Sequence, residues 1–209
     1  TAPREGDMVA LDKATGKVVW RRHMSNYSWS SPTLITGADG TIATAGTLIT
    51  TGITARNGNA VGTVASGTAG SITLEATQVT ATGALTTTGG ANGAGGNIAL
   101  TSTGTLNING AIATSGGTAN ASSAGRNAGN VTISGAGVTS IAAGTITASG
   151  SGATTAGSNQ PGGAGGAIQV SSTNGITLGA AVAASGGAAT TTNANGGNAG
   201  SITINNSGS

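Results

Sequence analysis

The chain has 209 residues, of which 40 are glycine and only 6% are charged, and it contains no Phe and no Cys. An average soluble domain carries roughly 25% charged residues and about 7% glycine, and the lack of cysteine excludes a disulfide framework and a thiolate metal site. The net charge of +2 forms no basic stripe, and there is no apolar run of about eighteen residues, so we expect neither a nucleic-acid partner nor membrane insertion.

Residues 1–40 differ from the rest of the chain, because they hold every aromatic residue, the only His and both Met. The alternating segments 6–12 and 17–21 are typical of two strands, and the polar residues between them are typical of a turn. We therefore predict an N-terminal β-hairpin element within a domain of residues 1–40, followed by a third strand at 30–36.

Residues 10–20 carry the pattern Ala-x-Asp-x-x-x-Gly-x-x-x-Trp. This pattern resembles the tryptophan-docking motif of the quinoprotein-type β-propeller repeat. The resemblance implies a packing role for Trp20 and a turn tied by Asp12 and Thr15, in which Gly16 suits a positive φ. A propeller has at least about four blades, so about 40 residues predict one blade-like element and not a complete propeller.

From residue 41 onward the chain is repetitive. Short runs in which Ile, Leu or Val alternates with small polar residues open successive repeats, and alternation with a period of two indicates a strand with one buried face. The repeats open at Ile72, Ile98, Val131, Ile168 and Ile202, so they are 26, 33, 37 and 34 residues apart, and an imperfect earlier copy covers 41–55.

Each repeat contains three such runs and a glycine-rich tail of variable length, as in 98–101, 106–109 and 112–114. One repeat cannot bury its own apolar face, whereas a stack of repeats can. We therefore predict that residues 41–209 form an all-β, right-handed parallel β-helix, a solenoid of three strands per coil and about five coils, with the glycine-rich loops on one edge.

In such a stack, equivalent residues of successive repeats lie about 4.8 Å apart and form columns. The residues predicted to form this core ladder are Ile72, Leu74, Ile98, Leu100, Val131, Ile133, Ile168, Val170, Ile202 and Ile204.

The glycine-rich segments 89–96, 116–129, 150–166 and 186–200 connect one repeat to the next. Two interpretations are open for them. They are either mobile surface loops, or a packed second layer of extended backbone in which glycine permits close approach.

No catalytic, cofactor-binding or metal-binding constellation is present in the sequence. After Asp39 the only charged residues are Arg56, Glu75 and Arg126, whereas glycoside hydrolysis requires two carboxylates. The glycine-rich segments lack the Asp of calcium-binding repeats, and His23 has no second His. We therefore predict that the protein is not an enzyme and that it has no cofactor.

The segment 95–108, Gly-Gly-Asn-Ile-Ala-Leu-Thr-Ser-Thr-Gly-Thr-Leu-Asn-Ile, is echoed at 129–133 and 165–178. These repeats resemble the secreted β-helix exoproteins of the filamentous-haemagglutinin and autotransporter-adhesin type. The resemblance implies an extracellular or bacterial cell-surface location and a stalk, adhesin or fibre.

The first functional hypothesis is accordingly a structural one: a fibre subunit or adhesin shaft that assembles end to end. The last strand pattern, at 201–206, opens an unfinished repeat, so we expect either further chain beyond residue 209 or self-association at this end. A second hypothesis is an ice- or polysaccharide-binding module, with surface glycans as partners. A third is a fragment of a quinone-dependent oxidoreductase.

Overall fold

The computed structural model describes residues 6–11, 18–24, 34–36, 41–61, 63–140, 144–154, 159–190 and 194–208, with side chains from residue 46 onward. The chain divides into two compact units, Thr1–Pro32 and Thr33–Ser209, so the division falls before the boundary at residue 40 expected from composition. No helix among the described residues is long and apolar enough to cross a membrane.

The first unit contains an antiparallel hairpin of β1 (Gly6–Leu11) and β2 (Val18–Met24). The backbone of Trp20 pairs with that of Ala10 in this hairpin. The other residues predicted to pack the N-terminal element, Asp12, Thr15 and Gly16, lie outside the described residues.

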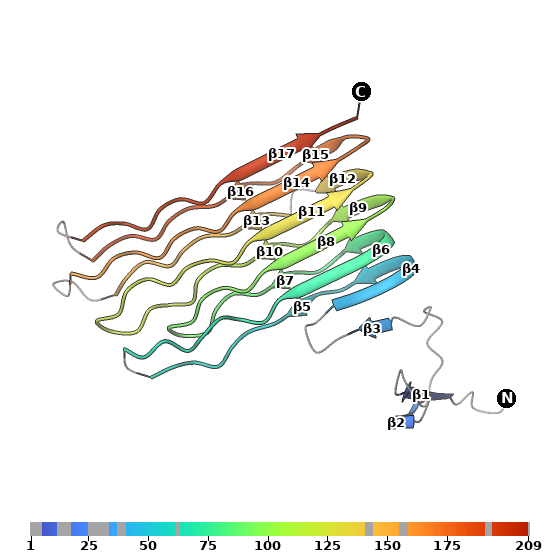
Figure 1. Ribbon diagram of the computed structural model, residues 1–209, viewed down its shortest axis with the longest axis horizontal. Helices are drawn as coiled ribbons and strands as arrows, with labels where there is room; N and C mark the ends of the chain where they lie inside the picture. Colours follow the sequence, from blue (N-terminus) through green and yellow to red (C-terminus); the bar gives the residue numbers. More distant parts are fainter. Residues whose placement is uncertain are drawn as a thin grey trace. The chain divides into compact units, whose positions relative to one another are not determined.

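The second unit is a stack of repeats built from short strands (Figure 1). It opens with β3 (Leu34–Thr36), which pairs antiparallel with the next strand. The first strands of the repeats are β4 (Thr41–Thr50), β6 (Ile72–Ala81), β8 (Ile98–Ser102), β11 (Val131–Gly135), β14 (Ile168–Ser172) and β17 (Ile202–Asn206). The second strands are β9 (Thr105–Ile108), β12 (Gly137–Ser140) and β15 (Ile176–Leu178). The third strands are β5 (Ile53–Thr54), β7 (Leu85–Thr86), β10 (Ile112–Ala113), β13 (Ile146–Thr147) and β16 (Val182–Ala183).

The fold is all-β, but the prediction of a right-handed parallel β-helix with three strands per coil is wrong. The described strands of the second unit form two sheets. The larger sheet has ten strands, with a main path β15-β12-β9-β6-β8-β11-β14-β17, and the smaller has five parallel strands in the order β16-β13-β10-β7-β5. The first and second strands of the repeats therefore belong to one sheet, and do not form separate sides of a coil.

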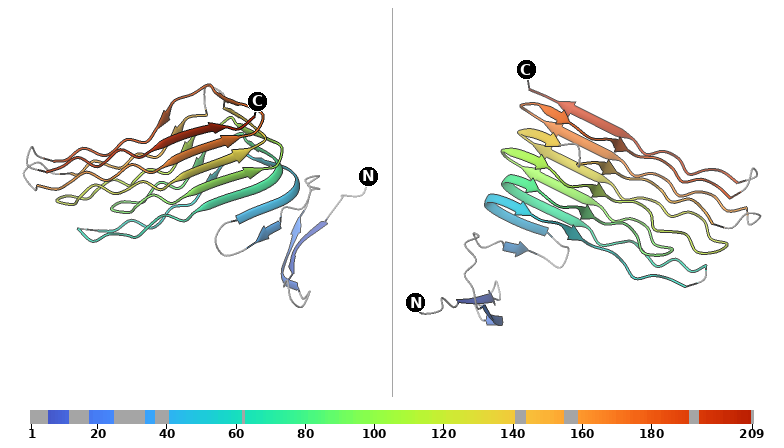
Figure 2. Two further views of the ribbon diagram at one scale, coloured as in Figure 1. Left: turned by 45° about the horizontal axis from the view of Figure 1, so that its top comes forward. Right: turned by 180° about the vertical axis from the view of Figure 1, so that it is seen from behind.

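The physical reason lies in β6, which is continuous over 10 residues and pairs with both β8 and β9. Its middle residues, 75–78, remain part of the strand, and β4 is continuous past the same place, so the two limbs of the large sheet are joined through these two strands (Figure 2). Later repeats are interrupted at the same place by Gly104 and by Gly175, which has a φ of +133°.

The buried aliphatic residues lie in columns that run through the stack. Ile72 pairs with Ile98, which pairs with Val131, and the same register continues to Ile168 and Ile202. The internal members of this column are at most 2% exposed. Full burial of each such side chain stabilises the fold by about 1.5–3 kcal/mol.

A second column runs two residues further along each strand, where alternation again directs the side chain inward. Its internal members are completely buried and pack in the same core as the first column. The residues of this column, in stack order, are Leu74, Leu100, Ile133, Val170 and Ile204.

The third strands complete the core from the second sheet. Leu85, Ile112 and Ile146 are completely buried and pair in register. They belong to the same hydrophobic cluster as the columns of the large sheet. Because neighbouring repeats share one core, the stack and not the single repeat is the unit of stability.

Candidate functional site

The glycine-rich segments are stacked in the same order as the strands (Figure 1). We call them the glycine layer, which comprises the described residues of 89–96, 116–129, 150–166 and 186–200. Backbone hydrogen bonds join successive segments: the amide of Gly95 donates to the carbonyl of Asn127 at 2.9 Å, and the amide of Gly125 donates to that of Pro161 at 2.8 Å. The described part of the layer is therefore packed and hydrogen-bonded, as in the second of the two interpretations.

Close packing of the layer explains its glycine content. A Cβ atom on Gly129 would lie 2.0 Å from the carbonyl oxygen of Gly96, and one on Gly163 would lie 2.1 Å from that of Arg126. The outgoing and returning limbs of each segment are also bonded to each other, since the amide of Gly129 donates to the Thr114 carbonyl at 2.7 Å. Any side chain at Gly129 or Gly163 would force the backbones apart.

The stack ends at an open sheet edge formed by β17. This strand pairs with β14, and no described strand pairs with its other edge. Ile202 and Ile204 are 45% and 49% exposed, whereas their column neighbours Ile168 and Val170 are 1% and 0% exposed. The two isoleucines thus continue the buried columns, and no repeat among the described residues covers them.

The backbone at this edge shows the same incompleteness. In the internal repeats, the backbone amide of the residue in the first column donates to a carbonyl of the next repeat. The Ile98 amide donates to the Asn130 carbonyl at 2.9 Å, and the Ile168 amide donates to the Ser201 carbonyl at 2.8 Å. Ile202 is the equivalent residue of the last repeat, and no further repeat follows it among the described residues. An unpaired strand edge of this kind is a template for pairing with another strand.

The opposite end of the stack is partly covered. There β3 pairs antiparallel with the first residues of β4, through Leu34 and Ala43, Ile35 and Ile42, and Thr36 and Thr41. A short antiparallel strand of this kind blocks part of an edge. Among the described strands, β17 thus has an edge that no strand covers, whereas the first residues of β4 are covered by β3.

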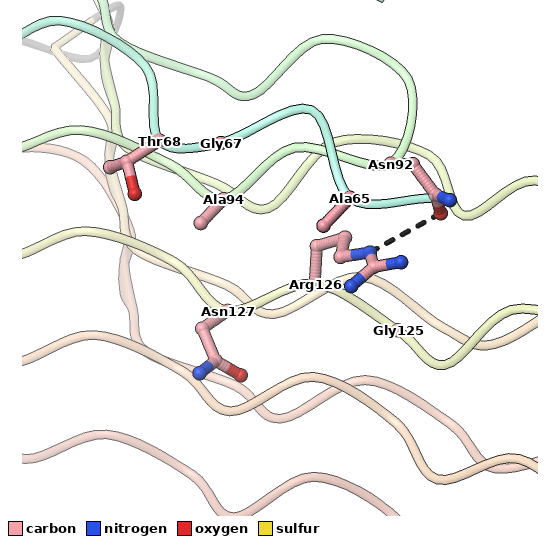
Figure 3. A pocket seen from close by; sticks show the side chains of 8 residues that line it. All are labelled: Ala65, Gly67, Thr68, Asn92, Ala94, Gly125, Arg126 and Asn127. Carbon is pink, nitrogen blue, oxygen red and sulfur yellow. Dashed lines mark hydrogen bonds between the residues drawn. The ribbon is translucent and has the colours of Figure 1, made fainter. Parts of the chain in front are cut away.

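A separate pocket of about 250 Å³ lies between residues 65–68 and the glycine layer (Figure 3). Its walls come from three successive segments of the stack, before β6, before β8 and before β11. The lining residues are Ala65, Gly67, Thr68, Asn92, Ala94, Gly125, Arg126 and Asn127. Arg126 is the only charged residue in this set, and its half-buried side chain reaches along the space between Ala65 and Gly125.

Asn92 holds the arginine in place. Its side chain is completely buried, and its oxygen Oδ1 accepts hydrogen bonds from Arg126 Nε at 3.2 Å and from the backbone amide of Asn120 at 3.1 Å. Its Nδ2 donates to the carbonyl of Val64 at 2.8 Å and to Ser123 Oγ at 3.2 Å. Asn92 adopts a φ of +61°, a conformation that Asn tolerates better than most residues. This network fixes one edge of the guanidinium.

The described residues include no group of three or more His, Cys, Asp or Glu side chains that could hold a metal ion. Glu75 lies exposed in β6, in the large sheet and not in the glycine layer. Sequence reasoning missed the Arg126 pocket, and the one available signal was an arginine in an otherwise uncharged glycine-rich segment.

Comparisons with known proteins add no family to this description: no protein-family model, no curated protein and no solved structure matches the chain.

Proposed function

We propose that the protein is a structural element of the extracellular space or the bacterial cell surface, a fibre subunit or adhesin shaft, and that its stack is extended when a second copy joins the β17 edge. The observation that carries the proposal is the open edge itself, where Ile202 and Ile204 are about half exposed and continue columns that are otherwise buried.

The chemistry of this edge favours association with a similar strand. The β17 sequence, Ile-Thr-Ile-Asn-Asn, carries no charge and no proline, so it has none of the usual features that prevent edge-to-edge pairing. A second strand would cover both isoleucines and satisfy the outward backbone groups at once. The likeness of the repeats to secreted exoproteins supports the proposed location.

The outward face of the smaller sheet gives less support to ice binding. Its outward column reads Thr54, Thr86, Ala113, Thr147 and Ala183. Threonines therefore do not form an unbroken row over the stack.

The proposal is tested by measuring the particle length and mass of the full chain over a range of concentrations, using negative-stain electron microscopy and light scattering. We expect elongated assemblies whose mass rises with concentration. Ile204→Lys places a charge at the open end of a column and should abolish them. Thr132→Lys, on the exposed face of the internal strand β11, is the matched control and should assemble normally. Compact single-chain particles at every concentration would refute the proposal.

A further inference from the structure

No carboxylate lines the pocket that holds the guanidinium of Arg126. Arg126 is half-buried in the glycine layer, and the only carboxylate after Asp39 in the sequence is that of Glu75, in the large sheet. Among the described residues its side chain makes one hydrogen bond, from Nε to Asn92 Oδ1 at 3.2 Å. A partly buried cation is stabilised when an anion completes its surroundings.

The geometry of the pocket determines which kind of anion fits. Since Nε is engaged by Asn92, the two Nη groups remain at the end of the guanidinium as a planar fork of donors. A carboxylate presents two oxygens in one plane and matches such a fork with two parallel hydrogen bonds. Figure 3 shows this end of Arg126 lying within the pocket, and not against a neighbouring side chain among the residues drawn.

The remaining wall favours a sugar as the carrier of that carboxylate. A volume of about 250 Å³ is just below the roughly 300–1,000 Å³ of typical small-molecule sites, so the pocket holds one small unit. The wall has no aromatic and no large aliphatic side chain, but it offers the Thr68 hydroxyl and the methyl groups of Ala65 and Ala94. It also offers Nδ2 of Asn127, whose Oδ1 already accepts from the backbone amide of Ala164. These groups suit a compact ring with hydroxyl groups better than an extended apolar ligand.

We propose that this pocket binds the carboxylate-bearing unit of an acidic sugar, with Arg126 as the anion-binding residue and Asn92 as the residue that positions it. The site is distinct from the β17 edge, so it would operate on a single copy of the chain as well as on an assembly. In an assembled fibre it would occur once in every copy.

The experiment is a titration of the isotope-labelled full chain, followed by nuclear magnetic resonance at the Nε–H signals of the two arginines after Asp39 and at the backbone amides. The probes are methyl glucuronide, the neutral methyl glucoside, acetate and an acidic tripeptide. We expect saturable shifts at Arg126 with the glucuronide and none with the glucoside. Acetate and the tripeptide should bind about tenfold more weakly or worse, because they lack the ring.

Two variants sharpen the test. Arg126→Gln should weaken glucuronide binding by about 10- to 100-fold, the range of a hydrogen bond to a charged group. Arg56→Gln removes the other, exposed arginine and should bind as the unaltered chain does. Because the shifts on the unaltered chain locate the ligand independently, a folding defect in Arg126→Gln would not obscure the result. Absence of shifts at Arg126, equal binding of acetate or the tripeptide, or full binding by Arg126→Gln would overturn the proposal.

Discussion

Replacement of Gly129 by alanine tests whether the glycine layer is packed at the separation described above. The new Cβ would lie 2.0 Å from the Gly96 oxygen and 2.4 Å from its carbonyl carbon, whereas unstrained carbon contacts occur at about 3.5–4.0 Å. Relief of this clash must move backbone and strain the bonds that Gly129 makes with Thr114, from amide to carbonyl at 2.7 Å and from Thr114 Oγ1 to the Gly129 carbonyl at 2.8 Å. Overpacking of about 1–3 kcal/mol, together with about 1 kcal/mol for each weakened hydrogen bond, predicts a destabilisation of roughly 3–5 kcal/mol.

The matched control is Gly137→Ala in the repeat that follows. A Cβ atom at Gly137 would meet only Thr105 Cγ2, at 3.9 Å. This variant should therefore be unchanged, or more stable by about 0.4–1 kcal/mol, because alanine restricts the unfolded chain. Urea unfolding of the three proteins, followed by circular dichroism, measures the difference. Equal midpoints for Gly129→Ala and the unaltered chain would refute the packed layer.

Two further stability predictions follow from the core. Ser140 Oγ is buried with no hydrogen-bond partner among the described residues, so Ser140→Ala should stabilise the protein by about 1 kcal/mol. Ser102→Ala removes a 2.7 Å hydrogen bond from Ser102 Oγ to the Thr77 carbonyl and should destabilise the protein by a similar amount. Urea midpoints that shift in the same direction for both would contradict this assignment. Ile133→Ala should lower the free energy of unfolding by about 2–5 kcal/mol, because the side chain is completely buried. Ile204→Ala in the dilute chain should lower it clearly less, because the Ile204 side chain is 49% exposed. Equal losses of stability in the two variants would show that Ile204 is covered.

The positions of the strands could be predicted from the sequence, but their division between sheets could not. Alternation at Ile98 and Leu100 identifies a strand and its buried face, because a one-residue shift would expose both side chains. Whether the next strand belongs to the same sheet depends on the corner between them. At 75–78 the strand continues without a break and joins the two limbs, and alternation alone does not reveal this.

The glycine layer and its pocket were beyond sequence reasoning for a different reason. A glycine-rich composition is compatible with both mobile loops and a packed layer, and only the approach of one backbone to another distinguishes them. The contact between Arg126 and Asn92 joins residues of successive repeats whose connecting segments differ in length. No fixed period therefore places one residue beside the other.

The most direct test of the central claim, that the β17 edge is open and is completed by another copy, is hydrogen exchange at the amide of Ile202. In the dilute chain this amide should exchange far faster than those of Ile98 and Ile168, which donate to the following repeat at 2.9 and 2.8 Å. At concentrations where the protein assembles, the Ile202 amide should become protected to a similar degree. Protection of Ile202 in the dilute chain, or continued fast exchange in the assembled material, would contradict the account.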